Sequence, residues 1–164
     1  MSVSRMAGLA FIAVSVFGPV AADAQPLPHQ RLGLWHTDIA MAGNHMSMQS
    51  CVDAASEAQN SIFSAAARKN GHCQQQQLTH NLDGSWTSIS TCQFGPSPPR
   101  TTRADVAGDF NSKVTMTMRS PPSAPPETTM TMTWVGPCEP GMRGGDVVMS
   151  NGMKMNTMDA MRGH

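Results

Sequence analysis

Two short alternating runs decide the fold of this chain: VTMTM at residues 114–118 and MTMTW at residues 130–134. Strict apolar/polar alternation of this kind is the period of a half-buried β-strand. A proline-rich turn over residues 120–127 separates the runs, so we expect them to fold back on one another about Ala124. That register pairs Met116 with Met132, Met118 with Met130 and Val114 with Trp134. All six apolar side chains then project from one face of the hairpin and all the threonines from the other.

The flanking sequence extends this hairpin into a larger antiparallel sheet. A three-residue turn over residues 111–113 would place Phe110 opposite Val114 and Val106 opposite Met118, which keeps the apolar face continuous. Alternation and turn signals predict further strands over residues 34–41, 45–52, 104–110 and the two arms of a hairpin from 73 to 94 about Asp83-Gly84. About seven strands joined mostly by hairpins favour an all-β fold, an antiparallel meander that forms a curved or barrel-like sheet.

One accessory helix is expected beside the sheet, covering an opening or an edge. Asp53 is a suitable N-cap residue, apolar residues recur at helical spacing from Ala55 to Ala66, and Gly71 is a ready stop. Residues 139–164 show little periodicity. We expect them to form a Met/Gly-rich C-terminal tail, a loop with a short hairpin around Asn151-Gly152 that frays toward its end.

The first 24 residues are predicted to be a cleaved signal peptide. Arg5 supplies a positive charge, residues 6–17 form an apolar stretch, and Ala22-Asp23-Ala24 is an A-x-A cleavage site. The apolar stretch is shorter than the roughly 20 residues of a membrane-spanning helix, so no stable membrane insertion is expected after cleavage. The mature protein is therefore expected to be periplasmic, with a β-rich domain over residues 25–138 ahead of the tail.

Composition argues against two classes of function. The chain carries 11 basic and 11 acidic residues, and this zero formal charge argues against nucleic acid as a partner. His36 and Asp38 share a strand face and could form an acid–base pair, but alternate residues on an exposed face are usually solvated. No serine lies in a nucleophile elbow and no glycine-rich phosphate loop is present. We therefore expect no catalytic residues and no enzyme activity.

The four cysteines are expected to form two disulfides, because their number is even and the chain is predicted to be exported. Three connectivities are possible. Cys73 and Cys92 lie almost evenly about the Asp83-Gly84 turn, so we favour a bond between them, with Cys51 bonded to Cys138. The parity of the hairpin then requires a one-residue bulge. A metal site is the rival interpretation, but no C-x-x-C spacing supports it.

A series of short motifs follows the predicted cleavage site in a distinctive order. They are Gly33-Leu34-Trp35, Cys51 ahead of a helix, the Cys73 to Cys92 hairpin, the two Thr-Met strands, Gly136-Pro137-Cys138, Pro140-Gly141-Met142 and residues 145–152. In order and spacing they resemble the domain-of-unknown-function 3617 family of exported bacterial proteins. His36 and Asn151 stand where members of the family often have acidic residues. The family has no established activity, so the resemblance implies a fold and export and supplies no catalytic residues.

Two clusters of methionine and histidine suggest copper as an alternative ligand. Thioether sulfur suits Cu(I), and imidazole binds either copper state. The candidate ligands are Met41, His45, Met46 and Met48 around a turn, and Met153 and Met155 in the tail. Packing competes with this interpretation, because the unbranched methionine side chain fills irregular cores well. For the methionines that alternate with threonine in the hairpin, packing is the favoured interpretation.

A curved sheet with an apolar inner face could hold an apolar small molecule, since ligand sites are mostly apolar and concave. The expected lining residues are Ile39, Val114, Met116, Met118, Met130, Met132 and Trp134. The sequence leaves open whether the interior is hollow or filled. Methionine-rich surfaces also adapt to varied partners, so an envelope protein is a related candidate. We therefore expect a non-catalytic binding module for an apolar ligand or an envelope protein, without a cofactor, and with copper binding as the alternative.

Overall fold

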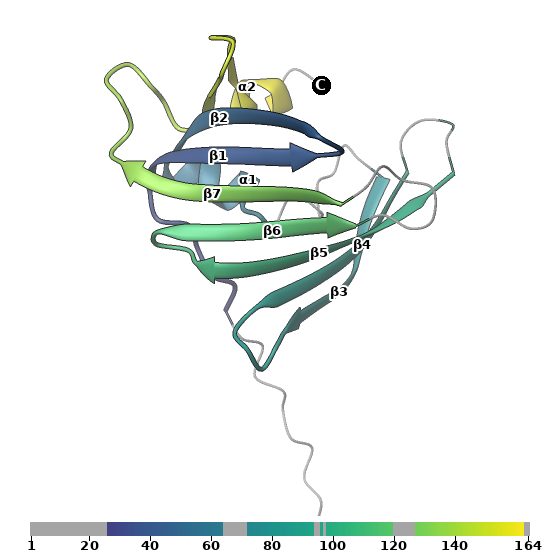
Figure 1. Ribbon diagram of the computed structural model, residues 1–164. Helices are drawn as coiled ribbons and strands as arrows, with labels where there is room; N and C mark the ends of the chain where they lie inside the picture. The colour runs from purple at the N-terminus through teal and green to yellow at the C-terminus, as the bar shows by residue number, and fades with distance from the viewer. Residues whose placement is uncertain (1–25, 64–71, 94–95, 97, 120–126, 163–164) are drawn as a thin grey trace, which may run out of the picture.

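The computed structural model describes residues 26–63, 72–93, 96, 98–119 and 127–162. Within these residues all the strands form one antiparallel sheet in the order β3-β4-β5-β6-β7-β1-β2-β8-β9 (Figure 1). The sheet is curved and does not close. The strands are β1 (Gly33–Met41), β2 (Asn44–Val52), β3 (His72–His80), β4 (Trp86–Gln93), β5 (Arg100–Asp109), β6 (Lys113–Arg119), β7 (Thr128–Gly136), β8 (Asp146–Met149) and β9 (Lys154–Asn156). The helices are α1 (Ala54–Asn60) and α2 (Thr157–Arg162), and neither is long and apolar enough to span a membrane.

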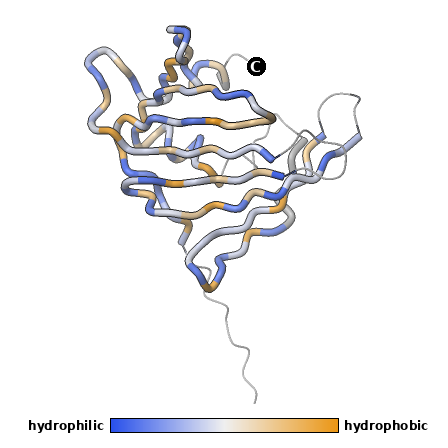
Figure 2. The backbone as a smooth tube through the Cα atoms, in the orientation of Figure 1, coloured by the Kyte–Doolittle hydropathy of each residue, from blue (hydrophilic) through white to orange (hydrophobic). Residues whose placement is uncertain are grey.

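The predicted fold class is confirmed, and two of the nine strands come from the segment expected to be a tail. The hairpin around Asn151-Gly152 joins β8 to β9, and β8 pairs with β2, so this segment continues the sheet. The helix α2 that follows was not expected. Figure 2 shows hydrophobic and hydrophilic residues interleaved along the strands, the pattern from which the strands were predicted.

The two faces of the sheet separate the methionines from the threonines, as the alternation predicted. We call the face that carries Val114, Met116 and Met132 the inner face, because these side chains pack in or against the core. The opposite, outer face carries Thr115 and Thr131, which lie opposite one another on β6 and β7. This division follows from the two-residue period of a strand.

The predicted pairing within the two late hairpins was wrong by two residues. Val114 lies opposite Met132 and Met116 opposite Met130. On the other side of β6, Gly108 rather than Phe110 lies opposite Val114. A two-residue shift changes the partners but keeps every side chain on its predicted face.

The cause of the shift at the β5–β6 turn is the side chain of Asp109. Its carboxylate accepts hydrogen bonds from the backbone N–H of Asn111 at 2.9 Å and from the hydroxyl of Ser112 at 2.8 Å. The turn has three residues, as predicted, but Asp109 places it at residues 110–112 instead of 111–113. The backbone N–H of Trp134 then bonds the carbonyl of Ser112, which carries the same register into β7.

The core on the inner face is mainly aromatic and β-branched. Phe63 is 4% exposed and packs on Trp86 and Phe110, with ring centroids 5.5 and 5.9 Å apart. Trp35, Val106 and the residues of the inner face named above complete the cluster. The burial of these rings contributes much of the stability, because aromatic side chains remove the largest apolar areas from water.

The helix is shorter than predicted, because α1 ends at Asn60. Ser61 adopts an extended conformation, which turns the chain so that Phe63 reaches the core. Helical spacing from Ala55 onward did not reveal that Phe63 anchors the core. The predicted later part of the helix, including Ala66 and the stop at Gly71, lies outside the described residues.

A disulfide joins Cys51 to Cys138 across the sheet, with Cα atoms 5.4 Å apart, so this predicted pairing is confirmed. Leu34 of β1 lies opposite both Cys51 and Gly136. The disulfide therefore crosses β1 near its start and links β2 to the residues that follow β7. The register of the other predicted pair fits as well. Cys92 is disulfide-bonded, Cys73 lies opposite it, and the bulge that parity required falls between Gln75 and Gln77.

Removing the Cys51–Cys138 bond should lower the free energy of unfolding by about 2–5 kcal/mol, because the bond spans 87 residues of sequence and limits the unfolded chain. Urea unfolding of the double variant Cys51→Ser, Cys138→Ser against the oxidised wild-type protein measures this. The comparison variant is Cys73→Ser, Cys92→Ser, where a bond would close a much shorter loop and cost less. An unchanged urea midpoint in the Cys51→Ser, Cys138→Ser variant would contradict a stabilising role of this disulfide.

Candidate functional site

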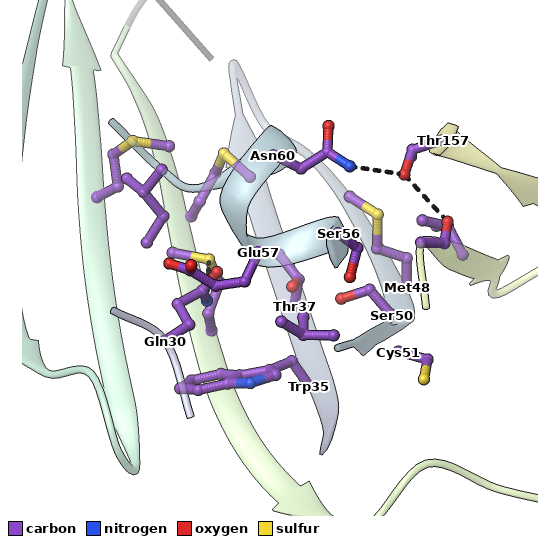
Figure 3. A pocket seen from close by; sticks show the side chains of 17 residues that line it. Gln30, Trp35, Thr37, Met48, Ser50, Cys51, Ser56, Glu57, Asn60 and Thr157 are labelled. Carbon is purple, nitrogen blue, oxygen red and sulfur yellow. Dashed lines mark hydrogen bonds between the residues drawn. The ribbon is translucent and has the colours of Figure 1, made fainter. Parts of the chain in front are cut away.

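A pocket of about 270 Å³ lies between the inner face of the sheet and α1. Figure 3 shows α1 above Trp35, with the side chain of Glu57 between them. The apolar lining is rich in thioethers and comes from β1, β2, β6, β7, β8 and the segment that follows α1: Trp35, Met48, Val52, Ile62, Met116, Met130, Met132 and Val147. The polar lining residues include Gln30, Thr37, Ser50, Ser56, Glu57, Asn60 and Thr157.

The pocket exists because small side chains interrupt the apolar inner face. Ser50 of β2 lies opposite Trp35 of β1, and Thr37 lies between Met48 on one side and Met132 on the other. A serine and a threonine fill less space than the methionines and tryptophan beside them. The inner face is therefore hollow near β1 and β2, whereas near β4 and β5 it is filled by Phe63 and Trp86.

The predicted lining residues divide among three environments. Met116, Met130 and Met132 line the pocket, as predicted. Val114 is fully buried in the core. Trp134 packs against the core, and Cζ of the Arg31 guanidinium lies 3.5 Å from the centroid of its ring. Met118 is half-buried opposite Thr128, outside the pocket, and Ile39 lines a separate hollow beside Thr129 and Thr131.

The fold distributes the predicted copper ligands over several places. Met48 lines the pocket, whereas His45 and Met46 line the hollow beside Thr129 and Thr131. Met46 follows the strand face of Met48 but is 51% exposed. Met41, Met153 and Met155 are also exposed, at the β1–β2 turn and on the β8–β9 hairpin. In the described part of the chain no three His, Cys, Asp or Glu side chains lie close enough to hold a metal ion.

His36 and Asp38, which were considered as an acid–base pair and set aside, do not line the pocket. Nε2 of His36 is 3.2 Å from Oδ1 of Asp38, and Asp38 is well exposed on the outer face. Side chains at alternate positions of one strand lie on the same face, so a contact between them is expected. The His36–Asp38 contact gives no indication of a substrate site.

A capping box fixes the start of α1 over the pocket. The backbone N–H of Ser56 donates to the carboxylate of Asp53 at 2.8 Å, and the backbone N–H of Asp53 donates to the hydroxyl of Ser56 at 2.9 Å. The bond from the Ser56 N–H holds the pKa of Asp53 below its usual value. The sequence predicted this N-cap from Asp53, and the structure confirms it.

Two polar side chains of α1, Glu57 and Asn60, face the pocket from above. They are three residues apart and therefore share one face of the helix. Oε2 of Glu57 lies 3.0 Å from Nδ1 of His29, and Nδ2 of Asn60 donates to Oγ1 of Thr157 at 3.0 Å. The remaining oxygens, Oε1 of Glu57 and Oδ1 of Asn60, are buried and have no hydrogen-bond partner within the described residues. Sequence reasoning missed both residues, because it treated the helix only as a cover.

The C-terminal segment closes one wall of the pocket and is held by the buried carboxylate of Asp146. This carboxylate accepts hydrogen bonds from the backbone N–H of Arg143 at 2.8 Å and from the Asn156 amide at 2.7 Å, and it pairs with Lys154 at 3.0 Å. These bonds, the one from Arg143 first, draw the pKa of Asp146 far below its usual value. The neighbouring Val147 lines the pocket.

A family model described as "Protein of unknown function (DUF3617)" matches residues 25–138. The chain belongs to this family. The match confirms the resemblance read from the sequence and covers β1 to β7 together with α1. The wall of the pocket formed by β8 and α2 lies beyond the matched residues. No curated protein and no solved structure matches the chain.

The contribution of Asp146 to stability should depend on pH. Because its pKa in the folded protein is lower than the ordinary 3.8, the carboxylate stabilises the fold above that pH. The stabilisation is lost as the pH falls through 3.8 toward the folded pKa. Asp146→Asn should therefore lower the free energy of unfolding by about 1–3 kcal/mol at pH 7 and by less at pH 3.

Urea unfolding of wild type and variant at the two pH values measures this difference. Asp38→Asn is the control, because an exposed carboxylate should change stability by no more than about 0.5 kcal/mol. An equal difference between wild type and Asp146→Asn at pH 7 and pH 3 would contradict the role of the carboxylate charge.

Proposed function

We propose that this protein is a non-catalytic binding module that holds an apolar small molecule in the pocket between α1 and the inner face. The observation that carries the proposal is the pocket itself, because its sheet-side wall is formed largely by thioethers and an indole. Small-molecule sites are concave and mostly apolar, with a few polar groups that fix orientation. This pocket combines an apolar floor with polar groups on one helix.

The size of the pocket limits the ligand. Its volume of about 270 Å³ lies just below the range of about 300–1,000 Å³ that drug-sized ligands occupy. It exceeds the cavity of about 150 Å³ that holds a benzene molecule in an engineered protein. A ligand of one or two rings or a short alkyl chain fits between these limits. Four flexible methionine side chains allow the wall to adapt to such shapes.

The proposal includes export to the periplasm. It is supported by the signal-like residues 1–24 and by the Cys51–Cys138 disulfide, a bond that persists in oxidising compartments. An envelope protein that inserts an apolar side chain into the same pocket is a variant of the proposal. Both variants place the contact at the same residues, so the same substitution blocks both.

Filling the pocket should abolish ligand binding. Ser50→Leu places a larger side chain against Trp35 and should weaken the binding of the neutral dye N-phenyl-1-naphthylamine at least tenfold, measured by fluorescence titration. Ser47→Leu is the matched control, because it makes the same change on the same strand but on the outer face. It should leave the dye affinity unchanged. Absence of dye binding to the wild type, or equal loss in both variants, would contradict the proposal.

Copper(I) is the second candidate, because the pocket gathers thioethers. Met48, Met116, Met130 and Met132 all line it, although only Met48 belongs to the predicted ligand set. Soft thioether ligands select Cu(I), and a methionine-lined site would serve in a compartment where thiols are oxidised. The exposed pair Met153 and Met155 is the rival location.

Competition for Cu(I) with a chromogenic chelator distinguishes the two locations. Met48→Leu with Met130→Leu should abolish copper retention if the pocket binds the ion, whereas Met153→Leu with Met155→Leu should abolish it if the β8–β9 hairpin does. A wild-type protein that removes no Cu(I) from the chelator ends the copper hypothesis and leaves the apolar-ligand proposal standing.

A further inference from the structure

We infer that the ligand is a cationic amphiphile, a short apolar chain that carries a primary ammonium group, and that the carboxylate of Glu57 binds this group. The inference rests on the proposed function, because it specifies the ligand class of the same pocket. It assigns the chain to the methionine-lined floor and the head group to α1.

The first observation is that a carboxylate that lines the pocket has one oxygen without a hydrogen-bond donor. Oε1 of Glu57 is buried, and within the described residues it has no partner. Most buried polar atoms in folded proteins are paired, and an unpaired one destabilises the fold. A ligand that donates to this oxygen would remove this cost on binding.

The second observation is that the side chain of Glu57 is already held in place. His29 contacts the other carboxylate oxygen of Glu57 at 3.0 Å. The amide nitrogen of Asn60 donates to Thr157 at 3.0 Å, and Figure 3 shows the amide oxygen turned away from Trp35 and Glu57, so Glu57 alone presents its acceptor toward the floor of the pocket. A binding site ordered in advance loses less conformational entropy when the ligand enters.

The chemistry of this oxygen selects the head group. It is an acceptor, and an ammonium group has three donors and no acceptor. Charge points the same way, because Glu57 is the single ionisable side chain among the described residues that line the pocket. A carboxylate in an apolar pocket attracts a cation and repels an anion such as a fatty acid. The indole of Trp35 beneath Glu57 adds a favourable surface for a cation.

Three probes of equal chain length separate the head groups: n-octylammonium, 1-octanol and n-octanoate. Isothermal titration calorimetry at pH 7 should give an affinity for n-octylammonium at least tenfold above that for 1-octanol, and a still lower affinity for n-octanoate. Glu57→Gln should reduce the preference for ammonium over alcohol to near unity while 1-octanol binds as before. The retained 1-octanol binding shows that the variant is folded and its pocket intact.

Glu139→Gln is the matched control, because it removes an exposed carboxylate outside the pocket by the same substitution. It should keep the full preference for n-octylammonium. Equal affinities for the ammonium and the alcohol in the wild type, or an undiminished preference in Glu57→Gln, would overturn this inference while leaving the apolar-ligand proposal intact. A wild type that binds none of the three probes would overturn the proposed function itself, and the inference with it.

Discussion

The packing of Phe63 against the inner face of the sheet is the interaction on which the rest of the structure depends. The ring is almost fully buried between Trp86 and Phe110, so the chain must leave the helical conformation a few residues earlier. This ends α1 at Asn60 and sets the position of the helix above β1 and β2. The pocket, its polar roof and its depth all follow from where that short helix stops.

The pocket is completed by parts of the chain that are far apart in sequence. Residues of β1, β2, β6 and β7 form its floor and α1 its roof, all within the residues that the family model matches. The last wall comes from β8 and α2, where Asp146 orders the segment and Thr157 links it to α1. A polar side of this kind opposite a thioether floor is suited to an amphiphile, with one part of the ligand desolvated and the other hydrogen-bonded.

Sequence patterns predicted the faces of the sheet well, because alternation reports directly which side chains are buried. They predicted the pairing of the strands less well. The hydrogen bond from the backbone N–H of Asn111 to Asp109 shifts the β5–β6 turn by one residue, and apolar/polar alternation carries no information about such a bond. The end of α1 was missed because helical spacing does not weigh the burial of Phe63. Whether the interior is hollow could not be predicted, since Ser50 makes space only in relation to Trp35, a neighbour on another strand. The strands of the C-terminal segment depend on hydrogen bonds to Asp146, which a search for alternation does not detect.

Methionine-methyl NMR tests the central claim, that the inner face holds a ligand beneath α1, most directly. The spectrum of protein labelled with ¹³C at its methionine methyl groups would be recorded during titration with N-phenyl-1-naphthylamine. The account predicts that the signals of Met48, Met116, Met130 and Met132 move together and saturate, while those of Met153 and Met155 stay in place. Signals that do not move, or movement confined to Met153 and Met155, would contradict it.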